Sequence, residues 1–188
     1  MTSFQKLIQQ VLRHSPYDNE ENKHQQDTLH LLNMSGEKCL YRDHLPGHIT
    51  SSAIILSPDS QKVLFHKHLY LNIWCGFGGH ADGDSDIYNV SIKEALEESG
   101  LRSIKPLSKE IFDIDIHTIP PNPLKKERKH QHYCLSYLFK ISRPYNEEFG
   151  PEGAPLKWVK ISQITKYCDN LYHQRLQDKM HLLNDQKV

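Results

Sequence analysis

The chain lacks the features that mark disulfide-rich secreted proteins, membrane proteins and strongly basic nucleic-acid-binding proteins. Its 188 residues include four cysteines, and none forms a Cys-x-x-Cys pair or pairs with histidine at a zinc-binding spacing. No apolar run approaches the roughly 20 residues that span a membrane. Lysine plus arginine and aspartate plus glutamate both number 23, so the formal net charge is zero. The sequence therefore predicts neither a membrane nor a nucleic-acid partner.

Few signals of export or targeting are present. The first 17 residues contain two basic residues and no acid, but they lack the apolar core of a signal peptide. We expect this segment to fold as a helix, and by elimination we predict a cytoplasmic location. In such a reducing compartment the cysteines are expected to be free and mostly buried. They are Cys39, Cys75, Cys134 and Cys168.

The most informative segment is a predicted helix over residues 87–99 that carries three glutamates close together. At about 100° per residue, Glu94, Glu97 and Glu98 fall within one narrow arc. The opposite arc is apolar and is predicted to pack on a core; it consists of Tyr88, Ile92, Ala95 and Leu96. Clustered carboxylates without matching cations suit a hard ion such as Mg²⁺, which also bridges to substrate phosphates. A merely solvated acidic face is the other interpretation.

The acidic helix and the glycine loop before it resemble a known motif. The segment from Gly79 to Leu101 is similar to the Nudix box, Gly-x5-Glu-x7-Arg-Glu-U-x-Glu-Glu-x-Gly-U, where U is aliphatic. The sequence departs from the box at Ser85, which replaces its first Glu, and at Lys93, which replaces its Arg. The other positions match: Gly79, Glu94, Ala95, Glu97, Glu98, Gly100 and Leu101. Because the three helix carboxylates are intact, we expect the chemistry of the family to be retained.

Three further motifs resemble a bacterial Nudix subgroup with a helical N-terminal extension. They are Arg42-Asp43-His44-x-Pro46-Gly47-His48-Ile49-Thr50-x-Ser52-Ala53, Trp74-x-x-x-Gly78-Gly79-His80-x-Asp82-Gly83-Asp84-x-Asp86 and His130-x-His132-Tyr133. In that subgroup an acid is expected at the position of Cys134. The resemblance implies the α/β class, as a Nudix-type α/β/α sandwich with a mixed sheet. It divides the chain into a helical extension over residues 1–46 and a hydrolase domain over residues 47–188.

The order of predicted elements agrees with this class. Apolar periodicity predicts two N-terminal helices, and alternation predicts the strands. The helices cover residues 4–12 and 20–34, the strands cover 52–56, 62–66, 104–117, 133–141 and 156–161, and a C-terminal helix begins near 162 with a break near Asp169-Asn170.

The resemblance implies a pyrophosphatase that cleaves a nucleoside diphosphate linked to another group. Mg²⁺ or Mn²⁺ would neutralise the diphosphate and acidify the attacking water. Glu94, Glu97 and Glu98 are the expected metal ligands, and Glu94 is the candidate for a base instead. The Gly78 carbonyl is a further expected ligand. Among the late-loop acids we favour Glu148 as another.

Four other residues are predicted to bind substrate. His130 and His132 point to the same side of a strand, His80 follows the glycine pair, and Arg128 lies in a basic loop that could attract an anion. For each of them a purely structural role is the competing interpretation. The expected partner is a small nucleotide-type molecule, and a homodimer is a further option that the resemblance implies.

Two alternative functions remain open. The first is an enzyme similar to isopentenyl diphosphate isomerase, because Cys75 beside Trp74 resembles the catalytic cysteine region of that enzyme. The hydrolase spacing of the three glutamates argues against it. The second is a non-catalytic nucleotide-binding module, which the departures at Ser85 and Lys93 favour slightly.

Overall fold

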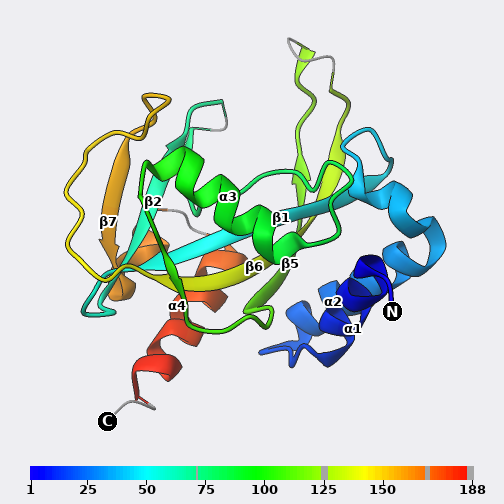
Figure 1. Cartoon of the computed structure of the whole chain (residues 1–188), viewed down its shortest axis with the longest axis horizontal. Coiled ribbons are helices and arrows are strands. Elements are labelled where there is room, and N and C mark those ends of the chain that lie inside the picture. The colour runs from blue at the N-terminus through cyan, green and yellow to red at the C-terminus, as the bar shows by residue number, and fades with distance from the viewer. Residues whose placement is uncertain (71, 124–126, 168–169, 186–188) are drawn as a thin grey trace. The chain divides into compact units, whose positions relative to one another are not determined.

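The computed structural model describes residues 1–70, 72–123, 127–167 and 170–185 (Figure 1). Its helices are α1 (Ser3–Arg13), α2 (Asn19–Ser35), α3 (Ile87–Ser99) and α4 (Leu171–Asp185), with short 3-10 helices η1 (Gly36–Leu40) and η3 (Ile161–Lys166). The strands are β1 (Gly47–Leu56), β2 (Lys62–His68), β3 (Ile73–Cys75), β4 (Lys105–Pro106), β5 (Asp113–Ile119), β6 (His130–Lys140) and β7 (Leu156–Lys160).

The chain divides into two compact units, each made of three segments. Unit 1 comprises Met1–Ser52, Gly78–Ser91 and Glu110–Tyr137. Unit 2 comprises Ala53–Phe77, Ile92–Lys109 and Leu138–Val188. The strands β1 and β6 and the helix α3 therefore each contribute residues to both units. The predicted boundary between residues 46 and 47 stays a prediction.

The two N-terminal helices of unit 1 form where the apolar periodicity predicts them. In α1 the Thr2 hydroxyl accepts a hydrogen bond from the Gln5 N–H, and the Gln5 side chain accepts one from the Thr2 N–H. This capping box satisfies two backbone donors that the helix start leaves free. In α2 the Asp18 carboxylate caps the helix by accepting from the Glu21 N–H.

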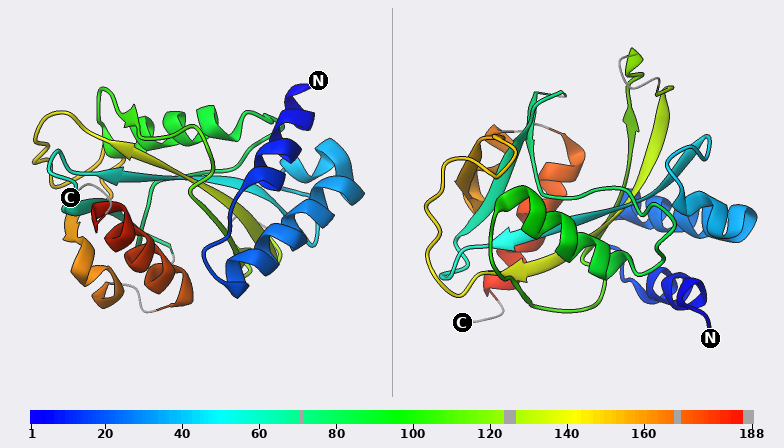
Figure 2. Two further views of the ribbon diagram at one scale, coloured as in Figure 1. Left: turned by 90° about the horizontal axis from the view of Figure 1, so that it is seen from below. Right: turned by 45° about the horizontal axis from the view of Figure 1, so that its top comes forward.

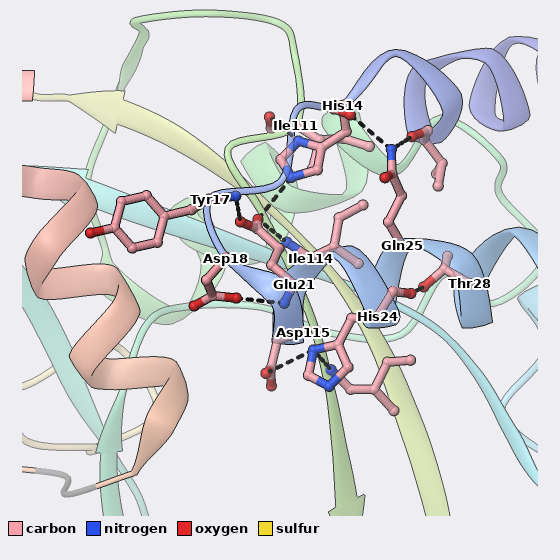
Figure 3. Close-up of polar contacts among 12 residues, drawn as sticks. His14, Tyr17, Asp18, Glu21, His24, Gln25, Thr28, Ile111, Ile114 and Asp115 are labelled. Carbon is pink, nitrogen blue, oxygen red and sulfur yellow. Dashed lines mark hydrogen bonds and ion pairs between the residues drawn. The ribbon is translucent and has the colours of Figure 1, made fainter. Parts of the chain in front are cut away.

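A buried carboxylate fastens α2 to β5 within unit 1 (Figure 3). Glu21 is fully buried, and it accepts hydrogen bonds from the Tyr17 N–H at 2.6 Å and the Ile114 N–H at 3.1 Å. The His14 Nε2 lies 2.8 Å from the same carboxylate. His24, one turn further along α2, contacts β5 through the Ile116 N–H. The N-terminal helices are thus tied to a strand by polar contacts as well as by apolar packing.

The strands of unit 1 form an antiparallel ladder between β5 and β6, from Asp113 opposite Ser136 to Ile119 opposite His130. The predicted strand over 133–141 is confirmed and begins earlier, at His130. The predicted strand over 104–117 is wrong in extent, because the chain forms only the two-residue β4 before β5 begins at Asp113. Pro106 cannot donate to a ladder, and the polar run that follows it lacks alternation.

In unit 2 the strand β2 pairs with three others, all antiparallel. Ile55 of β1 lies opposite Leu64, His66 opposite Cys75 of β3, and Leu64 also opposite Trp158 of β7. The predicted β1–β2 hairpin is therefore confirmed. In unit 2, the second half of α3 lies on one side of the strands and α4 on the other (Figure 2, left).

The C-terminal region of unit 2 contains two helical segments, one on either side of the predicted break. The 3-10 helix η3 ends at Lys166, and α4 begins at Leu171. Of the predicted break, Asp169 lies outside the described residues, as does Cys168. In the part of the chain that the structure describes, no helix combines the length and apolar character that crossing a membrane requires.

Candidate functional site

The helix that carries the acids begins and ends as its sequence predicts. Asp86 caps α3, because its carboxylate accepts from the Asn89 N–H at 3.2 Å and from the Asn89 side chain at 2.8 Å. Asp84 in turn accepts from the Asp86 N–H. Gly100 ends the helix with a positive φ of 74°, a conformation that favours glycine.

The buried stripe of α3 differs from the predicted one. The buried residues are Ile87, Val90, Ser91, Ala95 and Ser99, whereas three of the four expected ones are only half-buried: Tyr88, Ile92 and Leu96. Small side chains face the core in the second half of the helix. The hydroxyls of Ser91 and Ser99 donate to carbonyls of the helix itself, which allows both serines to be buried.

Because the buried stripe lies at a different angle around the helix axis than predicted, the surroundings of the three glutamates differ too. Glu94 and Glu98 follow Ser91 and Ala95 by three positions, so they flank the buried stripe and are half-buried, while Glu97 is exposed. We call these three glutamates the acidic arc. Two of its members thus lie at the edge of the core, where water screens a charge less than on an open helix face.

Glu98 lies beside a buried histidine of β2. Its Oε2 is 4.0 Å from the Nδ1 of His66, whose side chain is almost fully buried. Burial, followed by the nearby His68, lowers the pKa of His66 to about 4. His66 is therefore neutral near pH 7 and adds no positive charge that would compete with a metal ion for Glu98.

The loop before β7 is fixed against the C-terminal end of α3. A Cβ placed on Gly150 would lie 2.1 Å from the Glu98 carbonyl oxygen, so only glycine fits there. The Tyr145 hydroxyl donates to the Ser99 carbonyl, and the Trp158 Nε1–H donates to the Tyr145 carbonyl at 2.7 Å. Glu148 is an exposed residue of this loop. The structure thus keeps Glu148 and the acidic arc in one unit, and the role of Glu148 stays a prediction.

At Gly78 the backbone passes very close to the backbone of Ser51, which belongs to the same unit. A Cβ at this position would lie 2.1 Å from the Ser51 carbonyl oxygen. The next carbonyl, that of Gly79, accepts a hydrogen bond from the Ser51 N–H at 2.9 Å. Gly78 and the acidic arc belong to different units, and the ligand role of the Gly78 carbonyl stays a prediction.

The predicted substrate-binding histidines lie together in unit 1. The ring centroids of His80 and His132 are 5.1 Å apart, and those of His130 and His132 are 5.0 Å apart. Arg128 is exposed, and its carbonyl lies 2.7 Å from the His130 Nδ1. The structure thus brings the three histidines together and places the Arg128 backbone beside them.

Sequence reasoning missed His48 as a site residue. Its ring centroid lies 5.1 Å from that of His80, 4.9 Å from that of His130 and 4.9 Å from that of His132. The predicted strand began only at residue 52, whereas β1 begins at Gly47 and so includes His48 in a strand in which every second side chain shares a face. That alternation predicts on which face of β1 the His48 side chain lies, but it does not predict which residues of β6 lie beside it.

Comparison with known proteins identifies the fold. No family model matches the chain. A probable DHNTP pyrophosphohydrolase of Lactococcus lactis is 30% identical over 93 residues, which are 50% of this chain and 54% of that protein. The match thus spans about half the length of this curated relative.

Two solved structures are similar over most of their length. The Ap4A hydrolase of Caenorhabditis elegans gives a TM-score of 0.54 at 15% identity, covering 72% of this chain and 97% of that one. The dihydroneopterin triphosphate pyrophosphohydrolase of Escherichia coli gives 0.52 at 10% identity, covering 69% and 92%. Both are Nudix proteins. The chain has the Nudix fold. The predicted resemblance and the α/β class with a mixed sheet are confirmed.

In this chain the segment that resembles the Nudix box occupies the structural context that the motif requires. The segment from Gly79 to Asp86 is a loop, and the remainder of the box forms α3 and its glycine end. The first departure, Ser85, lies in the loop just before the helix cap. The second, Lys93, is exposed on α3, one residue before the acidic arc begins.

Proposed function

We propose that the chain is a divalent-metal-dependent Nudix hydrolase that cleaves a diphosphate bond in a small nucleotide-type substrate. The acidic arc of α3 carries the proposal, because it keeps all three helix carboxylates of the box close together, two of them half-buried, despite the departures at Ser85 and Lys93. The relatives support it, since their names describe an Ap4A hydrolase and two pyrophosphohydrolases of dihydroneopterin type.

The donor set fits Mg²⁺ or Mn²⁺. Both ions prefer oxygen ligands, and Glu94, Glu97 and Glu98 offer them from one helix face. The neutral His66 beside Glu98 leaves the carboxylate charge available. When bound, the ion neutralises diphosphate charge and lowers the pKa of the attacking water. Glu148 and the Gly78 carbonyl are proposed as additional ligands.

The remaining steps use groups of the chain. A glutamate of the arc that is not fully engaged by metal accepts the proton of the attacking water at a carboxylate oxygen, and Glu94 is our candidate. The fixed loop between Tyr145 and Trp158 holds the end of α3, so the carboxylates keep their relative positions. His80, Arg128, His130 and His132 keep their predicted role in substrate contact.

Hydrolysis assays with a single conservative variant test the proposal. Nucleoside triphosphates, nucleotide sugars, ADP-ribose and dinucleoside polyphosphates would be incubated with Mg²⁺ or Mn²⁺ and the full chain. We expect turnover of at least one class, reduced about a hundredfold or more by Glu98→Gln. The matched control is Glu37→Gln, which changes an exposed glutamate of η1. Turnover that Glu98→Gln leaves unchanged would refute the proposal.

The isomerase alternative rests on one observation. Cys75 lies opposite His66 in the β2–β3 ladder, and His66 contacts Glu98. A cysteine-dependent enzyme would lose activity in Cys75→Ser, whereas the proposed hydrolase retains it. Metal-dependent nucleotide binding by a well-folded chain without any turnover would instead identify the non-catalytic module. The cytoplasmic location, the homodimer and the absence of a nucleic-acid partner stay predictions.

A further inference from the structure

Five histidines gather in unit 1, drawn from four separate segments of the chain. His48 belongs to β1, His80 to the loop before α3, His117 to β5, and His130 and His132 to β6. For His48, His130 and His132, one ring nitrogen of each lies within 4.8 Å of those of the other two. We call these three residues the histidine triad.

Neighbouring backbone contacts create this convergence. The Gln131 N–H donates to the Pro46 carbonyl at 2.9 Å, which places the start of β6 beside the start of β1. Thr50 forms an isolated bridge with His80, which brings the loop to the same place. The triad is therefore held by the main chain and does not depend on flexible side chains meeting by chance.

The central histidine of the triad has no conventional partner. His48 is only 1% exposed, and neither of its buried ring nitrogens makes a hydrogen bond of normal geometry among the residues that the structure describes; a weak contact with the His44 backbone is its remaining polar interaction. A buried polar group left unpaired destabilises a protein, because it has lost its hydrogen bonds to water without replacement. Such a group in the middle of other imidazoles indicates a ligand that satisfies them together.

The second histidine is oriented for binding through Nε2. The Nδ1 of His130 lies 2.7 Å from the Arg128 carbonyl, which can only accept, so this nitrogen carries the proton. In the neutral ring the Nε2 then presents a lone pair. Metal-binding histidines are commonly fixed in this way by a carbonyl on the other nitrogen.

The third histidine lies at a spacing that suits a shared ion. The Nε2 atoms of His130 and His132 are 3.1 Å apart. Two nitrogens bound tetrahedrally to zinc at about 2.0–2.1 Å lie roughly 3.3 Å from each other. The two imidazoles thus already hold nearly the separation that one tetrahedral ion imposes.

We propose that His48, His130 and His132 bind one transition-metal ion, with Zn²⁺ as the physiological candidate. His80, whose ring adjoins those of His48 and His132, or a water molecule supplies the fourth ligand. Imidazole nitrogens suit Zn²⁺, Co²⁺, Ni²⁺ and Cu²⁺, while Mg²⁺ takes oxygen ligands. This site differs from the acidic arc in donor chemistry and does not depend on the proposed hydrolase activity.

The test is a Zn²⁺ titration of the full chain after its metals have been removed with a chelator. Competition with a chromophoric chelator gives stoichiometry and affinity, and Co²⁺ in place of Zn²⁺ reports coordination through its visible absorption. We expect one tight Zn²⁺ per chain in a variant lacking the acidic arc, Glu94→Gln/Glu97→Gln/Glu98→Gln. His132→Asn and His130→Asn should each weaken binding by about a hundredfold or more.

The control is His181→Asn, which changes an exposed histidine of α4 and should bind Zn²⁺ as the wild type does. Circular dichroism and thermal midpoints of the metal-free variants show whether they fold. If either triad variant fails to fold, X-ray absorption of the Zn²⁺-loaded arc variant decides instead, through imidazole scattering with Zn–N near 2.0–2.1 Å. The proposal is overturned if tight Zn²⁺ binding is absent, persists in both folded triad variants, or shows only oxygen ligands.

Discussion

The acidic arc and the histidine triad assemble from the chain in opposite ways. The arc consists of three oxygen donors from one turn of α3, two of them half-buried at the edge of unit 2. The triad consists of three nitrogen donors from β1 and β6, and His48 is almost fully enclosed in unit 1. A helix places like charges together through its own geometry, while imidazoles from separate strands meet only when the strands pair.

The difference also concerns what each group needs without a ligand. Carboxylates at a half-exposed edge can remain hydrated, so the arc tolerates the absence of a metal ion. The unpartnered nitrogens of His48 have no water-exposed surface through which to recover a lost hydrogen bond. We therefore expect the triad to affect stability and the arc to affect catalysis.

The largest expected effect separates the two groups by activity. Replacing the arc by Glu94→Gln/Glu97→Gln/Glu98→Gln should lower Mg²⁺-dependent hydrolysis about a thousandfold or more, because the ion's contribution of several kcal/mol is lost. His132→Asn should leave the Mg²⁺ concentration required for half-maximal activity unchanged. Initial rates across a Mg²⁺ series measure both. An equal loss of Mg²⁺ dependence in His132→Asn would mean that the two groups hold one ion together.

The second effect concerns Glu21, a buried polar group of unit 1 that contrasts with the unpartnered His48. Glu21 already has its partners in the Tyr17 N–H, the Ile114 N–H and His14. Glu21→Ala should lower the free energy of unfolding by about 3–5 kcal/mol, since three partners lose their acceptor. Urea unfolding measures this, with Glu37→Ala as the exposed control.

Zinc binding should distinguish Glu21 from the histidine triad further. At a free Zn²⁺ concentration a hundred times the dissociation constant, binding stabilises the folded chain by about 2.7 kcal/mol. We expect this increment in both the wild type and a folded Glu21 variant, and at most about 0.4 kcal/mol in His132→Asn, whose affinity is expected to be lower by about a hundredfold or more. If Zn²⁺ stabilised the wild type and His132→Asn equally, the ion would act through a site other than the triad.

A smaller effect concerns the support of the arc. Gly150→Ala would push a Cβ against the Glu98 carbonyl, so the loop must move away from α3. We expect a destabilisation of about 1–3 kcal/mol and a reduced kcat with Zn²⁺ affinity unchanged. Glu152→Ala, an exposed change in the same loop, is the control. Thermal unfolding and steady-state kinetics would show whether the loop supports the arc; wild-type behaviour of Gly150→Ala would exclude that role.

The smallest effect concerns thiol reactivity in the two units. Burial raises the pKa of Cys39 to about 11 and that of Cys134 to about 12. The reactive thiolate fraction rises with pH toward the pKa, so at pH 8 only about one thousandth of Cys39 is ionised. In a Cys168→Ser background, iodoacetamide at pH 8 should therefore label Cys75 in unit 2 first. Mass spectrometry of the digested chain gives the order, and equal labelling of Cys39 would contradict its burial.

The local parts of the structure follow from sequence periodicity and capping. The bounds of α3 agree with prediction, because helix ends depend on residues within one or two turns, here the cap Asp86 and the terminating Gly100. The β1–β2 hairpin agrees for the same reason. The buried stripe of α3 was predicted correctly only at Ala95, since hydrophobicity favours Ile92 and Leu96 whereas the core accepts the small Ser91 and Ser99.

The sequence by itself determined the acidic arc, because spacings of three and four residues in a helix fix which side chains are neighbours. It also indicated the Nudix fold through the box. Only the tertiary structure decided that His48 joins His130 and His132, since more than one segment of unit 1 must pair before they meet. Residues so far apart in the chain have no local spacing that could fix their distance, and strand register supplies it instead.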